Sequence, residues 1–431
     1  MSTVWTIFAQ AGGGSSSFGG GGGGGGFSGG GGGFGGGGTA GGGSPILILL
    51  IVAFFGILFV VGAIQTARMR RARRQRVERV ELASAEAAAD DEAFGADAVR
   101  EQATALFVEI QHAWDARDRD RLLELVGDDL MVEWARRLDD FERKGWHNRV
   151  KVHGTPEVEY VSMTNRADDA DDRVTVRLEA SLEVWVQTRN GGRIMQNGEQ
   201  SAMTALAEYW TLTKRGDDDR WTLLSIEQDA EGAHHLQADI IASPWGDSER
   251  LTQDAIAEGA AAGAAPAGVS PGELVDLDFS GPVRAQAMDL ALADSRFDVD
   301  LIEASVRRAV SAWAEAVDGD DAALEAAARP DAVRALLGDS GGRTRVVVRG
   351  PRVEQVTISA LDAQATPPTL TVDMRVHATR YVEDRDTVAL VSGSRDSATT
   401  FTERWTLALD AEGEWPWRIA ATQSGSRLAP T

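Results

Sequence analysis

Two glutamates lie where a strand is expected to turn them toward an apolar interior. Glu208 stands in the segment EYWTL, and Glu403 stands in the segment ERWTL. Side chains alternate between the two faces of a strand, so each carboxylate shares its face with the tryptophan two residues later. A buried carboxylate is costly unless a cation pairs with it, or unless its pKa rises so that it can act as an acid or a base. Both glutamates are therefore candidate groups lining an internal pocket.

A cationic partner can be predicted for each glutamate. Arg380 interrupts the apolar face of the neighbouring strand, and we predict that it forms an ion pair with Glu403. The equivalent position in the first strand pair is a valine, so the partner there must come from elsewhere, with Arg136 or Arg137 as candidates. Structural ion pairing is the favoured interpretation, because such pairs occur without any catalytic role.

Metal binding is not expected. His234 and His235 are adjacent, and neighbouring residues of a regular element do not face one ion together. The aspartate runs at 168–172 and 217–219 lack the glycine and terminal glutamate of a calcium loop, and they are typical of turns between strands. We predict no metal, no cofactor and no catalytic residue.

Two aromatic residues occupy equivalent places on a polar strand face. Trp185 lies among the outward positions of its strand, and Tyr381 lies at the matching position 196 residues later. A repeated aromatic on a solvent-facing surface indicates either a contact between the domains or a contact with a partner, although a single exposed aromatic is also common. We treat both as candidate contact residues.

The same motifs occur twice along the chain, at a spacing of 195 or 196 residues. The EYWTL and ERWTL segments form one pair, and the apolar alternation of residues 174–186 returns over 370–382. Further pairs are Trp221 with Trp417, Gly154 with Gly350, and Ala113-Trp114 with Ala312-Trp313 at a slightly different spacing. So many matches in one order indicate an internal duplication.

Each copy begins with helical periodicity and continues with strands. In the first copy, helices are expected at 98–114, 122–126 and 131–141. Strands are expected near 151–163, 173–187, 203–214 and 220–228. This order predicts an α+β fold in which helices cover one face of a curved antiparallel sheet, as in the cone-shaped modules of the cystatin or nuclear-transport-factor-2 (NTF2-like) type.

The two copies are expected to be separate domains, at residues 95–247 and 276–426. Residues 248–275 between them are rich in Ala, Gly and Pro and hold few large apolar residues, which predicts a linker.

An enzymatic alternative uses the pocket of one copy. Isomerases and dehydratases of this fold place a carboxylate or a histidine beside an apolar pocket for proton transfer. The candidates here are Glu208, Tyr209 and His153, but no second titratable group is positioned against them by the sequence. A small-molecule sensor using the same pocket is the related possibility, and analogy of fold alone is a weak argument for either.

Residues 46–64 form an uncharged apolar segment, ILILLIVAFFGILFVVGAI. A helix of this length spans about 28 Å, close to the ~30 Å hydrocarbon core, so we predict a single transmembrane helix over 45–66. Arginines follow it in the juxtamembrane segment 67–94, whereas none precede it, which places the two domains in the cytoplasm and the protein in the cell (inner) membrane. Seven arginines are expected to contact anionic lipid: Arg68, Arg70, Arg71, Arg73, Arg74, Arg76 and Arg79.

Residues 1–44 form a glycine-rich tail that is expected to be disordered and extracytoplasmic, because its composition cannot bury a core. Ala9-Gln10-Ala11 follows a short apolar stretch and resembles a signal-cleavage site; either this is coincidence or the true start lies upstream.

Charge and cysteine content exclude some classes of function. The net charge of −23 argues against nucleic-acid binding by the domains, since phosphate contact needs a basic surface. The chain has no cysteine, which excludes disulfides and thiolate metal sites and is consistent with a reducing compartment.

Residues 97–247 carry FVEIQHAWDARD, EYWTL, RWTLLSIEQ and EGAHHL in order, and with these motifs the segment resembles the Tim44-like domain of bacterial membrane proteins. The second copy keeps the strand motifs and lacks EGAHHL. The resemblance implies a pocket between sheet and helices, membrane association and, in the mitochondrial relatives, a scaffold that recruits a chaperone to a protein-import channel. This chain differs by its transmembrane segment, by its duplication and by lacking the long recruiting helices, so the chaperone partner is not carried over.

The expected function is therefore that of a membrane-anchored, non-catalytic binding or scaffold protein. Its partner would be a polypeptide, a membrane protein or a lipid at the cytoplasmic face, in protein transport or envelope assembly. The first copy, which lies nearer the membrane, is the expected binding domain.

Overall fold

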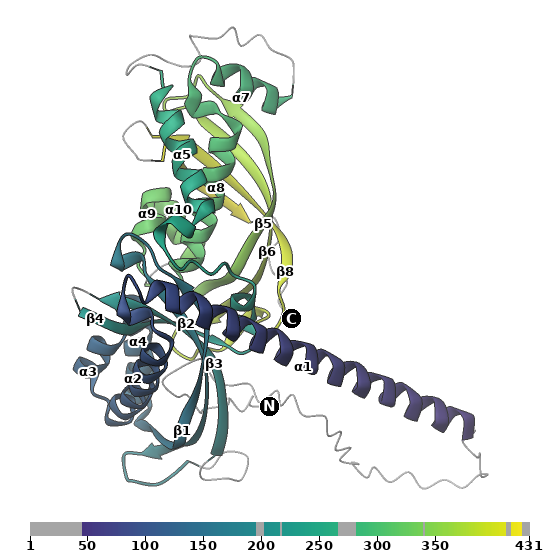
Figure 1. Cartoon of the computed structure of the whole chain (residues 1–431), viewed down its shortest axis with the longest axis vertical. Coiled ribbons are helices and arrows are strands. Elements are labelled where there is room, and N and C mark those ends of the chain that lie inside the picture. The colour runs from purple at the N-terminus through teal and green to yellow at the C-terminus, as the bar shows by residue number, and fades with distance from the viewer. Residues whose placement is uncertain are drawn as a thin grey trace.

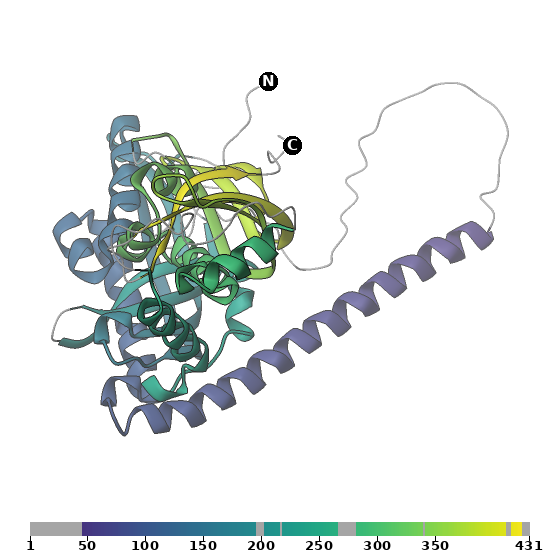
Figure 2. The same cartoon turned by 90° about the horizontal axis from the view of Figure 1, so that it is seen from above.

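The computed structural model describes residues 45–194, 202–215, 218–265, 282–338, 341–410 and 415–424, without side chains for most of 45–66. Two α+β units lie one above the other, and the long helix α1 (Pro45–Ala87) extends away from them (Figures 1 and 2). The predicted tail, residues 1–44, lies outside the described residues.

The first unit has helices packed on a four-stranded antiparallel sheet. Its helical segments are η1 (Glu92–Phe94), α2 (Ala96–Ala116), α3 (Arg119–Leu125) and α4 (Asp128–Lys144). Its strands pair in chain order and are β1 (Trp146–Thr164), β2 (Arg173–Thr188), β3 (Ala202–Arg215) and β4 (Asp218–Gln228). The chain then forms the short 3₁₀ helices η3 (Glu231–Leu236) and η4 (Pro244–Gly246).

The second unit repeats this order. Its helical segments are α5 (Ser248–Ala262), α7 (Val283–Ala291), η5 (Ser295–Phe297), α8 (Val299–Glu315), α9 (Ala322–Ala327) and α10 (Pro330–Leu337). Its strands are β5 (Thr344–Asp362), β6 (Thr369–Asp384), β7 (Leu390–Gly393), β8 (Thr399–Leu409) and β9 (Trp417–Ser424). The sheet order is β5-β6-β8-β9, and the short β7 pairs with β6.

The sequence prediction of helices followed by an antiparallel sheet is confirmed in both units. Alternating apolar residues turn one face of each sheet toward its longest helix, α2 or α8, and two separate cores result. In the first core Trp210 packs 5.2 Å from Phe107 between ring centroids, and in the second Trp405 packs 6.3 Å from Trp313. Strand β7 was not predicted, since four residues carry too short a pattern.

One packing arrangement at the start of each unit shows the duplication directly. Trp221 on β4 packs edge-on against Phe94 at 5.3 Å, and its indole donates to the Ala93 carbonyl at 3.0 Å. On β9 Trp417 packs edge-on against Phe297 at 5.4 Å, and its indole donates to a backbone carbonyl of η5. An aspartate caps the short helix in both units. The repeated motif therefore encodes a repeated tertiary contact.

The C-terminal half of α1 belongs to the first unit, which corrects the prediction that 67–94 is only a juxtamembrane segment. Val80 and Ala87 are fully buried in the first core. Arg76 is also buried, and it donates to the Val161 carbonyl at 2.6 Å and to Ser162 Oγ at 3.1 Å. This part of α1 packs on β1 as α7 packs on β5 in the second unit.

The predicted transmembrane segment lies in the N-terminal half of α1, where most side chains are outside the description. Within the part of the chain that was described, no helix is both long and apolar enough to cross a membrane.

The predicted linker 248–275 is wrong for its first half. Residues Ser248–Ala262 form α5, which packs on α8 and buries Ala260 in the second core. The linker was predicted from the high alanine and glycine content, but alanine also has the highest helix propensity, so the same composition is compatible with a helix. The second unit thus begins near residue 248.

Candidate binding site at the contact between the two units

Both candidate glutamates are buried, as the strand alternation predicts. Glu208 is 3% exposed, and its Oε2 accepts a hydrogen bond from the indole of Trp210 at 3.0 Å. Glu403 is 1% exposed, and Arg380 Nη1 donates to its Oε1 at 2.8 Å. The predicted Arg380–Glu403 ion pair is therefore confirmed. The guanidinium also lies 4.7 Å from the ring centroid of Phe401, which adds a cation–π contact.

The two arginines that were predicted as partners of Glu208 instead make contacts with the second unit. Arg136 binds the Asp386 carboxylate at 3.1 Å and the Gly342 carbonyl at 3.0 Å. Arg137 donates to the Asp386 carbonyl at 2.9 Å. Both arginines lie in the middle of α4, where they meet the second unit.

The two candidate contact aromatics have different outcomes. Tyr381 is 4% exposed, and its hydroxyl donates to Oε1 of Glu231, in the first unit, at 2.7 Å. The prediction that it marks a contact between the domains is therefore confirmed. Trp185 is half-buried, and within its own unit Arg193 and Arg149 lie 4.5 Å and 5.9 Å from its ring centroid.

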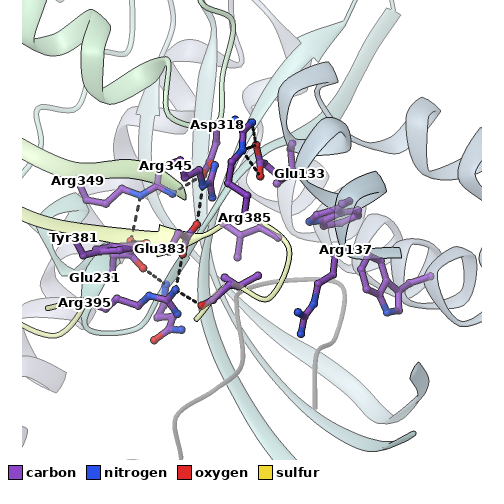
Figure 3. Close-up of a pocket in the computed structure, with 16 residues that line it drawn as sticks. Glu133, Arg137, Glu231, Asp318, Arg345, Arg349, Tyr381, Glu383, Arg385 and Arg395 are labelled. Atoms are coloured by element: carbon purple, nitrogen blue, oxygen red, sulfur yellow. Dashed lines mark hydrogen bonds and ion pairs between the residues drawn. The ribbon is translucent and has the colours of Figure 1, made fainter. Parts of the chain in front are cut away.

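Glu231 joins the two units. It begins η3, in the EGAHHL motif, and is 4% exposed. Besides Tyr381, it accepts from Arg349 Nε at 3.3 Å and from the Gln228 backbone N–H at 3.3 Å. Arg349 also binds Asp318, which is 3% exposed. A carboxylate of the first unit is thus held by a tyrosine and an arginine of the second (Figure 3).

The charged network continues within the second unit. Arg345 binds Asp318 at 2.9 Å and Glu383 at 2.7 Å, and Arg395 binds the other oxygen of Glu383 at 2.5 Å. The guanidinium of Arg395 lies 5.0 Å from the ring centroid of Tyr381. Three arginines of the second unit therefore face its own two carboxylates and the one supplied by Glu231.

Burial and neighbouring charges shift the pKa values of this network in opposite directions. Burial raises the pKa of Glu231, although the Arg349 guanidinium opposes the rise. Burial alone would raise the pKa of Asp318, but Arg349 and Arg345 outweigh it and lower that pKa. Burial also raises the pKa of Tyr381 well above its usual value, so its hydroxyl remains a donor. The arginines and the tyrosine hydroxyl therefore hold the buried carboxylates in one structural network.

A turn of the second unit closes the mouth of the first cone. Arg385 binds Glu133 on α4 at 2.9 Å, and Asp386 binds Arg136 and Arg137 as described above. Val388 follows in the same turn and adopts a positive φ of 56°, which is rare for a β-branched residue. A cavity of about 80 Å³ is left between this turn and Trp114 of the first unit (Figure 3).

This cavity is far smaller than the roughly 300–1,000 Å³ of small-molecule sites. Larger hollows of about 560 Å³ and 600 Å³ lie beside Gly145 and between α2, α3 and β4. Neither Glu208 nor Glu403 lines either hollow. The predicted pocket around these carboxylates is therefore not any of these three cavities.

The residues of the enzymatic alternative do not converge. Tyr209 lies on the opposite sheet face from Glu208, in a small cluster with Val161 and Leu236. His153 is exposed on β1, 3.5 Å from Glu183. The sheet separates Glu208 from Tyr209 and from His153, which both lie on its outer face, so the geometry does not pair Glu208 with either group.

The two adjacent histidines converge on one carboxylate, against the argument made from sequence. His234 Nδ1 and His235 Nε2 each lie 3.4 Å from the buried carboxylate of Glu227 on β4, and both histidines belong to the short 3₁₀ helix η3. These three residues are the group with metal-ligand spacing among the described residues. Burial lowers the pKa of His234 to about 4, so its ring is neutral at pH 7. We interpret Glu227, His234 and His235, which lie beside Arg349, as a hydrogen-bonded cluster that supports η3.

The predicted lipid-contacting arginines divide into two groups. Arg68, Arg70, Arg71, Arg74 and Arg79 are exposed, and lipid contact stays a prediction for them. Arg76 is buried as described above, so the prediction is wrong for it. Arg73 is 17% exposed in its side chain and lies 3.9 Å from both Glu179 and Asp229, which places it against the first unit.

Comparison with known families decides what these two units are. The model of the Tim44-like domain matches residues 80–228 and again residues 284–424. This chain belongs to the Tim44-like domain family. The first match begins inside α1, in agreement with its packing, and the second match confirms that the module is duplicated.

Solved structures give distant likenesses to this Tim44-like protein. The intermembrane space region of the chloroplast protein ARC6 shares 10% identity at a TM-score of 0.24, over 30% of this chain and 95% of its own. An Ntf2 like protein involved in plasmid conjugation shares 9% identity at a TM-score of 0.19, over 73% of this chain and 90% of its own. No curated protein matches the chain.

Sequence reasoning missed the centre of the site in this Tim44-like chain. Glu231, Asp318 and Arg349 were not predicted, because they lie at the start of a short 3₁₀ helix, in the turn after α8 and beside a strand bulge, where periodicity does not fix the direction of a side chain. One signal was present. EGAHHL occurs in the first copy only, and a motif that one copy needs and the other lacks indicates a contact made once.

Proposed function

We propose that this Tim44-like protein is a non-catalytic scaffold that is anchored in a membrane by residues 46–64 and engages a protein partner on the cytoplasmic side. Protein transport or envelope assembly is the setting that fits such a scaffold. The observation that carries the proposal is the closed first cone, whose mouth is filled by residues 385–388 of the second unit and retains about 80 Å³.

A closed cone supports surface binding over turnover. Carboxylates that line the remaining cavity are paired with arginines, as in the contacts of Glu133 with Arg385 and of Glu383 with Arg345. Catalysis needs an accessible reacting centre with acid, base or nucleophile within reach of it. Tim44-like domains are generally non-catalytic, which agrees with this arrangement.

Membrane anchoring rests on the sequence of residues 46–64 and on the exposed arginines that follow. The backbone there forms the continuous helix α1, which runs into the first unit without a break. A rigid connection of this kind would hold the first unit at a fixed distance from the bilayer. The cytoplasmic orientation is inferred because arginines flank residues 46–64 on the C-terminal side and not on the N-terminal side.

Photo-crosslinking in native membranes tests the proposal. Benzoylphenylalanine is introduced at single exposed positions of both units in the full chain, and carbonate extraction with protease protection reports anchoring and orientation. We expect discrete protein adducts from a carbonate-resistant chain whose units are protease-accessible only from the cytoplasmic side. A chain that is extracted by carbonate, or that yields no protein adduct from any position, would contradict the proposal.

A further inference from the structure

The outer sheet face that holds Glu231 in the second unit has an equivalent in the first. The strand registers define it, because Trp185 stands opposite Arg149 on β1 just as Tyr381 stands opposite Val347 on β5. Two residues along, Lys151 stands opposite Glu183, as Arg349 stands opposite Thr379. Lys151 therefore occupies the place of Arg349.

Both faces carry the same aromatic–arginine arrangement. Arg193 lies 4.5 Å from the ring centroid of Trp185, and Arg395 lies 5.0 Å from that of Tyr381. Each of these arginines comes from the segment after the strand that bears the aromatic. Each aromatic also carries a hydrogen-bond donor, an indole N–H in one and a hydroxyl in the other.

The charge balance of the two faces differs by one carboxylate. In the second unit, Arg345, Arg349 and Arg395 meet Asp318, Glu383 and the incoming Glu231. In the first unit, two carboxylates lie beside Arg149, Lys151 and Arg193, although Arg149 stands in the place of Val347 and Glu183 in the place of Thr379. Asp115 binds Arg149 through both oxygens at 2.7 Å, and Glu183 lies 3.9 Å from Arg193 and opposite Lys151.

We propose that this face of the first unit, centred on Trp185, Lys151 and Arg193, binds a carboxylate-bearing segment of the protein partner in the way that the second unit holds Glu231. The inference rests on the proposed scaffold function and specifies its binding surface. Lys151, His153 and Arg193 are exposed, so an incoming chain reaches them directly.

Charge favours a short acidic peptide over an extended anionic surface. The chain carries a net charge of −23, which repels a membrane or a nucleic acid as a whole. A segment with one or two carboxylates meets only the local cations, because charges beyond about 8 Å are screened at physiological salt.

The test uses the full chain in neutral phosphatidylcholine nanodiscs and a fluorescent peptide with the sequence of residues 228–237, which contains Glu231. The acceptor of the second unit is already occupied by this segment within the chain, so added peptide reports on the first. We expect saturable binding of this peptide to the unmodified chain. The affinity should fall at least tenfold when the peptide carries Glu231→Gln. It should fall by as much when the chain carries Lys151→Glu plus Arg193→Glu, or Trp185→Ala. Trp185→Tyr, which copies the second unit, retains binding. Arg284→Glu plus Arg375→Glu, at exposed positions of the second unit, is the matched control.

Three results overturn the inference. The first is the absence of saturable binding up to about 1 mM peptide, a concentration equivalent to roughly −4 kcal/mol. The second is equal binding of the wild-type peptide and the Glu231→Gln peptide. The third is binding of the chain to phosphatidylglycerol vesicles, instead of to the peptide, through the same residues. Benzoylphenylalanine at position 185 is compared with position 288 in native membranes. Adducts from other positions without any from 185 reject this surface and leave the scaffold function intact, whereas no adduct anywhere rejects both.

Discussion

The two units share one fold, yet the same outer sheet face is buried in one and open in the other. In the second unit Tyr381 and Gly350 lie against η3 of the first, and a Cβ on Gly350 would be 2.4 Å from His234. In the first unit two arginines of the same unit lie over Trp185, and a Cβ on Gly154 would meet nothing within 4 Å. One duplicated surface has therefore become an internal joint, and its copy remains available.

The helices before the sheet diverged in a related way. Helix α4 of the first unit spans 17 residues, whereas its counterpart α10 spans 8. The longer helix supplies Glu133, Arg136 and Arg137, which bind the turn at residues 385–387. The difference shows that the contact is directional, because the longer helix of the first unit receives a turn of the second.

Removing the central cation should have the largest effect on this joint. Arg349→Ala leaves Asp318 and Glu231 buried without their common partner, and we expect a loss of about 3–5 kcal/mol in the free energy of unfolding. Urea denaturation of the full chain in detergent measures it. Arg375→Ala, which breaks an exposed pair with Glu354, should cost under about 0.5 kcal/mol. Equal losses in the two variants would mean that the buried network contributes nothing to the joint.

The repeated glycines allow the internal contact to be separated from backbone strain. Gly350 and Gly154 have φ values of 53° and 75°, so alanine is strained at both, at about 1–2 kcal/mol. Only at Gly350 does the added methyl meet His234, which should cost about 2 kcal/mol more. The difference between Gly350→Ala and Gly154→Ala, by urea denaturation, reports the contact. Equal losses of stability in Gly350→Ala and Gly154→Ala would contradict the claim that this face is buried in the second unit and open in the first.

Acid should weaken the joint through His234. Its pKa is lowered by burial from 6.5 to about 4, so the unfolded chain binds the proton first as pH falls, and the folded state loses stability between those values. The loss should reach about 2 kcal/mol by pH 5. Glu227, His235 and Arg349 face the ring, and Glu227 opposes the shift.

The measurement is the free energy of unfolding at pH 7 and pH 5. His234→Gln should flatten the dependence, whereas His112→Gln, at an exposed position, should leave it unchanged. An identical pH dependence in His234→Gln would exclude this residue as the origin.

The smallest expected effect distinguishes the two aromatics. Tyr381→Phe removes the hydrogen bond to Glu231, which Arg349 still binds, and we expect a loss of about 1–2 kcal/mol. Trp185→Tyr changes no contact between the units and should stay within about 0.5 kcal/mol. A larger loss at Trp185 than at Tyr381, by thermal or urea denaturation, would reverse the comparison.

Side chains on regular strands were predictable from the sequence. Alternation placed Glu208 and Glu403 in the cores, and one basic residue on an apolar face was enough to identify the Arg380 pair. Tyr381 was found because its position is repeated. The common factor is that a strand fixes the direction of every second side chain.

Contacts between the units were not predictable in this way. Glu231 lies after a strand end, Asp318 lies beyond α8, and the bulge near Arg349 breaks the register of β5. Their directions depend on how two folded bodies meet. Helix α5 was missed for a different reason, since it is held by packing of small residues that also occur in linkers.

The central claim is that the second unit closes the first cone and holds it through the contacts of Glu231 with Arg349 and Tyr381. Because the chain has no native cysteine, spin labels can be attached at Leu123→Cys and Leu292→Cys, on exposed positions of the two units. Double electron–electron resonance on the full chain in nanodiscs then gives the distribution of distances between the units. A single narrow distribution is predicted, and it should broaden when Glu231→Gln and Arg349→Ala are combined. A broad or multiple distribution in the unmodified joint would contradict the account.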